Sequence, residues 1–167
     1  QMVDRAVRKL QQTDSGLAPE DINVRLDHID QAIPESYIRS TSQRLSLYKA
    51  LGTLPTKEDL WDFRNGIENR FGALPESVLN IFRNAEVRLW GQLHGVETIE
   101  HDHNRLRIQL KDASKLNHEK LIEWLCEQET ALSYIPENTL DFKNVPPEMP
   151  AILNGLKKLE QVFTVSS

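Results

Sequence analysis

Histidine and acidic side chains gather in one short stretch of this sequence, and such clusters can hold a metal ion. His101, Asp102 and His103 are consecutive, with His94 and His118 nearby in the chain. The surrounding pattern predicts a hairpin, which places His101 and His103 on either side of its turn rather than on one rigid face. No Cys or Glu stands at the spacing of a structural zinc site or of a His-Glu helix motif. We therefore interpret the stretch as a polar turn rather than a metal site.

Other side chains with chemical potential also lack the context that catalysis requires. A serine nucleophile needs a strained elbow or an adjacent base, and the serines of the first half have neither: Ser36, Ser40, Ser42 and Ser46. Paired carboxylates sit among solvated charges, as in Asp27 with Asp30 and Glu127 with Glu129. The seven glycines occur singly, so no phosphate-binding loop exists. The sequence thus favours a non-enzymatic domain that binds no cofactor within these residues.

Amino-acid composition limits the kinds of partner that the chain is expected to bind. Acidic residues outnumber basic ones 25 to 20, and the net charge is −5. Nucleic-acid modules usually carry a basic stripe, so direct DNA contact is not the expected task, whereas docking onto a basic protein surface is. No apolar run approaches the ~20 residues of a membrane span. The single cysteine, Cys126, excludes an internal disulfide and suits a reducing cytoplasm. We expect it to be half-buried on a helix.

The first half of the chain reads as mainly helical. A leading helix with an apolar face of Val3, Ala6, Val7 and Leu10 is predicted. It starts at the first residue, as expected of a chain cut from a longer protein. A strand is predicted at Ile22–Leu26. Three helices come next. The first is capped at Ser40–Ser42 and ends at Gly52, the second is capped by Thr56, and the third has Pro75 at its first position. Their predicted apolar faces are Leu45, Tyr48, Leu51; Leu60, Phe63, Ile67, Phe71; and Val78, Phe82, Ala85, Leu89, Leu93.

The second half changes to strand-like alternation. Val96–His101 and Arg105–Leu110 form a predicted hairpin closed by residues 102–104. A helix capped by Asn117 follows, then short strands around residues 132–134 and 139–142. A last helix has the apolar side Met149, Ile152, Leu153, Leu156, Leu159 and Phe163. The predicted fold class is α+β: a helical N-terminal half, then a small mixed β-sheet with packed helices. Residues 1–167 form one domain on one core, subdivided at about 1–95 and 96–167.

Two motifs bracket the first two helices. One reads Ile33-Pro34-Glu35-Ser36-Tyr37-Ile38, followed by Arg44-Leu45-Ser46-Leu47-Tyr48, and the other reads Asn69-Arg70-Phe71-Gly72-Ala73-Leu74-Pro75. Pro34 and Pro75 set φ where elements begin, and Gly72 permits a helix-ending turn. Tyr37 and Tyr48 supply large amphipathic rings. These roles are structural.

In order and separation, these motifs resemble the C-terminal domain of the bacterial transcription-repair coupling factors, the Mfd family of ATP-dependent DNA translocases. The likeness covers most of the chain and is strongest from Asp21 to Gly95. The signature residues are Ile33, Pro34, Tyr37, Arg44, Leu45, Tyr48, Phe71, Gly72 and Pro75.

The resemblance implies a regulatory role. In that family the ATPase modules, with their ATP and Mg²⁺, lie earlier in the parent chain, which displaces RNA polymerase stalled at DNA lesions. The C-terminal domain packs on an N-terminal module and masks its surface for the repair protein UvrA until polymerase is engaged. The implied function is autoinhibition in nucleotide excision repair, in the bacterial cytoplasm, by a monomer whose direct partner is that N-terminal module.

One departure from the family pattern bears on this contact. The helix before Arg-Phe-Gly usually offers two acids one turn apart, but Gly66 and Asn69 stand at those positions here. We therefore expect a weaker clamp that uses the surface around Arg64, Glu68, Asn69 and Arg70. A smaller departure is Arg39-Ser40-Thr41 after Ile38.

A rival interpretation stays open: an accessory domain that contacts DNA or RNA polymerase for the same translocase. A basic patch built from Arg5, Arg8, Lys9, Arg105 and Arg107 would favour it. For Arg105 and Arg107 alone, a solubilising strand face is the simpler interpretation. Trp61 and Trp90 lie off the apolar stripes, so each is either a core-edge residue or an interface anchor.

Overall fold

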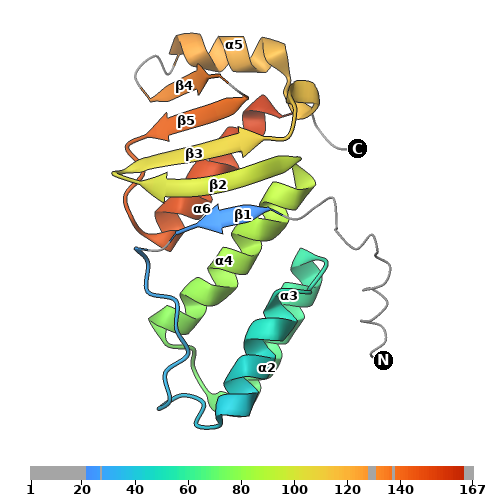
Figure 1. The fold of residues 1–167 in the computed structure, drawn as a ribbon, viewed down its shortest axis with the longest axis vertical. Helices are drawn as coiled ribbons and strands as arrows, with labels where there is room; N and C mark the ends of the chain where they lie inside the picture. Colours follow the sequence, from blue (N-terminus) through green and yellow to red (C-terminus); the bar gives the residue numbers. More distant parts are fainter. Residues whose placement is uncertain (1–21, 27, 128–130, 137, 164–167) are drawn as a thin grey trace.

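A five-stranded sheet and a helical extension share one long helix in this protein (Figure 1). The structure is a computed structural model that describes residues 22–163 except 27, 128–130 and 137. The predicted leading helix on Val3, Ala6, Val7 and Leu10 lies outside the described residues. Strand β1 (Asn23–Arg25) pairs parallel to β2, and the remaining pairs are antiparallel, in the order β1-β2-β3-β5-β4. The predicted α+β class with a mixed sheet is confirmed.

The first two described helices begin at the predicted caps, and the third begins directly after Pro75. The three are α2 (Thr41–Leu51), α3 (Lys57–Phe71) and α4 (Glu76–Leu93). The Ser40 hydroxyl accepts from the Gln43 N–H at 3.2 Å. The Thr56 hydroxyl accepts from the Asp59 N–H at 3.1 Å and donates to its carboxylate at 2.9 Å. These contacts satisfy backbone donors that a helix N-terminus leaves free.

Two predicted apolar faces are partly wrong. In α2 the buried residues are Leu47 and Leu51, whereas Leu45 is 56% exposed and Tyr48 41% exposed. The Tyr48 hydroxyl instead accepts from the Ile33 N–H at 3.1 Å, which holds that ring at the edge of the core. In α4 the last predicted core residue, Leu93, is 59% exposed. The reason is that the C-terminal half of α4 buries Val87 and Gly91 against the sheet, on a different side from Leu93.

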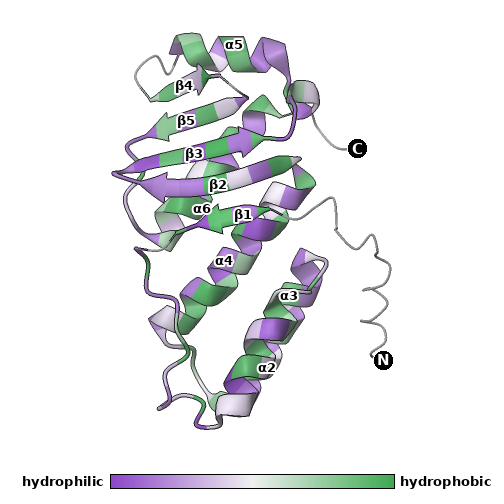
Figure 2. Ribbon diagram, viewed as in Figure 1, coloured by the Kyte–Doolittle hydropathy of each residue, from purple (hydrophilic) through white to green (hydrophobic). Residues whose placement is uncertain are grey.

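The sheet presents one apolar face and one polar face. Strands β2 (Val96–Asp102), β3 (Arg105–Leu110), β4 (Leu132–Ile135) and β5 (Thr139–Lys143) join β1. Hydrophobic and hydrophilic residues alternate along β2 and β3 (Figure 2). The hairpin turn is shorter than predicted, because Asp102 still pairs with Arg105. Its two residues, His103 and Asn104, have φ of 51° and 60°, as a right-twisting hairpin turn requires.

Helices cover the apolar face. Helix α6 (Met149–Leu159) lies behind the sheet beside α4, and α5 (His118–Glu127) lies beyond β4 (Figure 1). The Asn117 side chain accepts from the Lys120 N–H at 3.0 Å, so the predicted cap is confirmed. Short 3-10 turns occupy Ala113–Lys115 and Glu160–Val162. Phe163, predicted on the last helix, lies beyond it and bridges to Leu116, because the chain leaves α-helical geometry at Glu160.

Two buried clusters divide the described part of the chain, where the sequence suggested one core. We call them the sheet unit and the helical unit. The sheet unit comprises the strands, α5, α6 and the α4 residues Val87 and Trp90. The helical unit comprises α2, α3, the preceding connection and the α4 start up to Ala85, together with Leu89. The division therefore falls inside α4, and β1 joins the sheet although it precedes all the described helices.

The histidine stretch is not simply a polar turn. His101 is 4% exposed on β2 because the alternation of the strand places it on the same face as Ile99. Its Nε2 donates to the Val145 carbonyl at 2.6 Å, and its Nδ1 lies 3.0 Å from Nε2 of His28. The described residues contain no group of three or more His, Cys, Asp or Glu placed to hold a metal. Cys126, expected to be half-buried, is exposed on α5.

Candidate interaction surface

The signature residues converge in space although they lie far apart in the sequence. The Tyr37 hydroxyl donates to the Gly72 carbonyl at 2.6 Å across a separation of 35 residues. The Tyr37 and Phe71 rings are 5.9 Å apart. Gly72 ends α3 with φ of 96°, a conformation that a side chain disfavours. Burial raises the pKa of Tyr37, and the Glu68 carboxylate raises it further, so the hydroxyl remains a donor.

The first motif builds the entry to α2. The Pro34 carbonyl accepts from the N–H groups of Tyr37 and Ile38 at 2.9 and 3.1 Å. The Arg44 guanidinium donates to the Ile38 and Arg39 carbonyls at 2.7 and 3.0 Å. These bonds satisfy carbonyls in a segment that has no regular partner, which fixes its path.

The turn before α4 is fixed in a similar way. Pro75 precedes the first residue of α4 by one position, rather than occupying it as predicted. Its carbonyl accepts from the Val78 and Leu79 N–H groups at 3.0 and 2.9 Å. Among the nine signature residues, Leu45 has a mostly exposed side chain, which points away from the buried side of α2.

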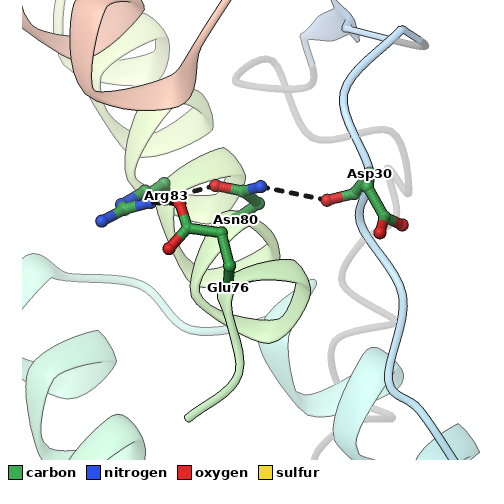
Figure 3. A network of polar contacts seen from close by, with 4 residues as sticks. All are labelled: Asp30, Glu76, Asn80 and Arg83. Atoms are coloured by element: carbon green, nitrogen blue, oxygen red, sulfur yellow. Dashed lines mark hydrogen bonds and ion pairs between the residues drawn. The ribbon is translucent and has the colours of Figure 1, made fainter.

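A polar network holds the connection after β1 onto α4 (Figure 3). The side-chain amide of Asn80, a buried residue, donates to the Asp30 carbonyl at 3.1 Å. The Arg83 guanidinium donates to the Asn80 side-chain oxygen at 3.0 Å and to the Glu76 carboxylate at 2.9 Å. Since Asp30 leads directly out of the sheet unit, this network links the two units and fixes the Arg83 side chain. The network was not predictable from the sequence, because an isolated asparagine on a helix is typical of an exposed residue.

The four predicted contact residues do not form one face. At about 100° per helical residue, Asn69 lies opposite Leu60, while Arg64 and Glu68 lie on one flank and Arg70 on the other. Arg64 lines a hollow beside Phe82 of α4, and Arg70 lines one beside Leu47 of α2. The Arg70 guanidinium lies 4.9 Å from the Phe71 ring centre. Only Asn69 faces directly outward.

The outward face of α3 is nevertheless continuous and exposed. It comprises Glu58, Asp62, Asn65, Gly66 and Asn69. Glu58 and Asp62 are one turn apart, so their carboxylates share a face that includes no basic side chain. Sequence reasoning missed this pair. The available signal was their spacing opposite the buried residues Leu60 and Ile67.

The two positions where the sequence departs from the resembled family both lie on this face. Gly66 and Asn69 are exposed and three residues apart. A Cβ atom built at Gly66 would meet nothing within 4 Å. The face therefore has room for longer side chains at Gly66.

The tryptophans differ in their surroundings. Trp61 is 58% exposed, with the Arg64 guanidinium 5.1 Å from its ring centre. Trp90 is half-buried and donates to the Glu160 carboxylate at 3.0 Å. Trp124 packs against Phe142 in the sheet unit. Trp61 is therefore an exposed aromatic side chain next in sequence to Asp62 of the outward face.

Among the described residues, the strand arginines form no strong basic patch. Arg105 is paired with the buried Asp141 carboxylate at 3.2 Å. Arg107 is exposed, and its cross-strand neighbours are Glu100 and Asp141. Arg5, Arg8 and Lys9 lie outside the described residues. Nor is any described helix long and apolar enough to cross a membrane.

Comparison with known proteins agrees with this geometry. The family model of the TRCF domain matches residues 28–121, which is more than half of the chain. A crystal structure of the C-terminal domain of transcription-repair coupling factor superposes with a TM-score of 0.65. The superposition covers 84% of this chain and 94% of that one at 15% identity, so it supports the fold. The chain belongs to the TRCF domain family.

Curated relatives carry the same name. The transcription-repair-coupling factor of Borreliella burgdorferi is 25% identical over 130 residues, and that of Bacillus subtilis is 28% identical over 97. The Staphylococcus epidermidis protein is 31% identical over 127 residues, 74% of this chain. These matches span 12%, 8% and 11% of the three relatives, so the chain corresponds to a small part of each.

Proposed function

We propose that this chain is a non-catalytic, autoinhibitory domain of an Mfd-type ATP-dependent DNA translocase in transcription-coupled nucleotide excision repair. In the resting parent protein it covers an N-terminal module and masks the UvrA-binding surface of that module. Engagement with stalled RNA polymerase releases the contact. The parent works in the bacterial cytoplasm, and this segment contacts neither DNA nor nucleotide.

The observation that carries the proposal is family membership over the helical unit, where the TRCF match and the converging signature residues coincide. The signature side chains are mainly engaged in holding α2, α3 and the start of α4 together. A rigid helical unit presenting one exposed helix face suits a docking role. It does not suit catalysis, which needs convergent titratable groups in a cleft.

The outward face of α3 is the contact surface that we propose. Glu58 and Asp62 supply two solvated carboxylates on it, which complement a basic module. Since the two surfaces belong to one parent chain, tethering supplies a high effective concentration, and an individually weak contact is sufficient. The clamp can then be opened by a partner that supplies a few kcal/mol of differential binding.

The function is tested by measuring UvrA binding to the full parent translocase with and without the segment Gln1–Ser167. Removal of a mask should strengthen UvrA binding by about tenfold, equivalent to ~1.4 kcal/mol. Unchanged affinity would reject masking. A concurrent loss of DNA retention or of polymerase binding would then favour an accessory contact role instead.

The departures at Gly66 and Asn69 provide a graded test. Gly66→Glu with Asn69→Asp adds two carboxylates to the outward face, next to Glu58 and Asp62. We expect a tighter clamp and weaker UvrA binding by the parent, by about three- to tenfold, since exposed ion pairs contribute up to ~1 kcal/mol each. The matched control is Gly66→Gln in a chain that keeps Asn69. It makes a similar helix-favouring replacement at position 66 without adding charge. Equal UvrA affinity in both variants would exclude an electrostatic clamp at these positions.

A further inference from the structure

A groove separates the two units on a side of the molecule that the proposed clamp does not use. It lies between α4, α6 and the connection from α2 to α3, with a volume of about 780 Å³. Leu89, Leu93, Leu153 and Pro150 contribute to its apolar surface. Leu93 is 59% exposed there, although it ends a helix whose other apolar residues are largely covered.

A smaller hollow of about 170 Å³ adjoins this groove. The two share Lys57, Arg83 and Glu86 as lining residues. The small hollow ends at the exposed Trp61 and at Arg64. The Nε atom of Arg64 is buried and has no hydrogen-bond partner among the described residues. The positive charge of the Arg64 guanidinium at this end of the groove favours an incoming carboxylate.

The groove and the adjoining hollow carry a small excess of positive charge in a chain that is negative overall. Together they are lined by four cations and two anions: Lys57, Arg64, Arg83, Lys157, Glu86 and Glu160. Lys57 is paired with Glu86 at 3.4 Å, and Arg83 is paired with Glu76 at 2.9 Å (Figure 3), so Arg64 and Lys157 are the lining cations outside these pairs. The net charge of the whole chain is −5. A local positive excess favours acidic partners.

The walls of the groove limit the shape of the partner. They are two helices and the short connection from α2 to α3 and include no strand, so an added β-strand finds no sheet edge to pair with. Glu86 and Glu160 on the lining disfavour a nucleic-acid backbone, which needs an uninterrupted basic track. An apolar floor with cationic sides fits a helix that has an apolar stripe and acidic flanks.

We propose that this groove binds an acidic amphipathic helix of another protein. The apolar stripe of the bound helix packs on Leu89, Leu93 and Leu153 of the groove. The carboxylates that flank this stripe face Lys157 and Arg64. The contact is distinct from the outward face of α3 and goes beyond the proposed masking function. The groove reaches the flank of α3 that faces α4, whereas the proposed clamp uses the outward face of α3. Both surfaces can therefore be occupied at once.

The test uses the chain Gln1–Ser167 and a fluorescent capped peptide of about 18 residues. Its Leu residues stand at i, i+4, i+7 and i+11, and Glu flanks the stripe. We expect saturable binding that weakens with salt. A peptide with the same leucines and Lys in place of Glu should bind at least about tenfold more weakly, because several exposed charge pairs of up to ~1 kcal/mol each are reversed.

Matched variants locate the site. Lys157→Glu should weaken binding of the Glu peptide by about fivefold, whereas Lys158→Glu, on the same exposed turn but outside the lining, should leave it unchanged. Leu93→Gln should weaken binding by about tenfold, since it removes a half-exposed apolar anchor. Leu45→Gln is its control, because Leu45 is 56% exposed and lies on α2 away from the groove. Circular dichroism checks that all four variants fold.

Three results would overturn the proposal. The first is equal binding of the Glu and Lys peptides. The second is that each variant and its control change the affinity for the Glu peptide equally. The third is concentration-dependent self-association that Leu93→Gln abolishes, measured by light scattering, which would assign the groove to a second copy of this chain.

Discussion

The sheet unit and the helical unit bury their side chains differently. In the sheet unit, Ile99, Ile108, Leu140 and Ile152 are fully buried between the strands and two helices. The helical unit has a smaller buried cluster. Both units leave large apolar side chains exposed: Leu45, Tyr48 and Trp61 are more than 40% exposed in the helical unit, and Ile122 on α5 is 62% exposed in the sheet unit. Helices α2 and α3 lie away from the sheet (Figure 1), and many of their residues are exposed.

This difference separates two tasks. The sheet unit gains stability from enclosed apolar surface, while the helical unit is positioned by specific polar contacts that join distant segments. The bond between Tyr37 and Gly72 and the network around Asn80 are of that kind. Exposed surface on a fixed framework is what a docking domain requires. The predictions below test how far the two units differ.

Truncation of a core leucine in each unit should have the largest effect. Leu156→Ala removes a side chain that is 1% exposed between α6 and the sheet, and we expect it to lower the free energy of unfolding by about 3–5 kcal/mol. Leu47→Ala, in the smaller cluster, should cost about 2–3 kcal/mol, because a thinly covered site collapses more easily. Urea unfolding followed by circular dichroism measures both. A larger loss for Leu47→Ala would contradict the comparison.

The same glycine replacement should have opposite signs in the two units. In Gly91→Ala the new Cβ would collide with the end of the Ile22 side chain and crowd that of Ile99; because side-chain ends can shift, the cost is about 1 kcal/mol, the low end for overpacking. In Gly66→Ala the Cβ enters open space on an exposed helix, so stability should rise by up to ~1 kcal/mol. Thermal unfolding distinguishes the two. Destabilisation by both replacements would mean that α3 is as tightly enclosed as the sheet unit.

Much of the fold was predictable because local chemistry determines it. The caps at Ser40, Thr56 and Asn117 and the alternation of Leu106, Ile108 and Leu110 each led to the observed element. The buried side of α2 was not predictable, since both Leu45 with Tyr48 and Leu47 with Leu51 fit a helical stripe. Which pair is buried depends on where α3 and α4 pack.

The surface was harder to predict than the fold. Arg64, Glu68, Asn69 and Arg70 are adjacent in sequence, but a helix turns them to three different sides. The groove between the units was invisible to the sequence because its residues come from segments that only the fold brings together. Glu58 and Asp62 were identifiable from spacing, yet only once the buried side of α3 was known.

The smallest effect concerns pH and belongs to the sheet unit. His94 donates to the Trp90 carbonyl at 2.9 Å and packs against the rings of Trp90 and Phe163, which also contact each other. Burial lowers its pKa below 6.5, although the Trp90 hydrogen bond and Glu160 oppose the shift and Lys115 adds to it. The unfolded chain therefore takes up this proton more readily, and the associated stability, present above pH 6.5, is lost as pH falls through the lowered pKa.

We expect His94→Gln to reduce the pH dependence of the free energy of unfolding between pH 7 and pH 5. Urea unfolding of the parent chain and the variant at both pH values measures this difference. His118→Gln, an exposed histidine at the start of α5, is the control and should leave the pH dependence unchanged. Identical pH dependence in the His94 variant and the parent chain would show that His94 is not the group responsible.

The most direct test of the account is UvrA binding by the full parent translocase with Glu58→Arg and Asp62→Arg. This reversal leaves the buried side of α3 intact and replaces the two carboxylates of the outward face. The control is Glu119→Arg with Glu123→Arg, an exposed acidic pair at the same spacing on α5. We predict that the α3 reversal opens the clamp and strengthens UvrA binding by about tenfold, ~1.4 kcal/mol, while the α5 reversal changes nothing. Equal UvrA affinity in both variants and the unmodified parent would contradict the claim that α3 holds the mask in place.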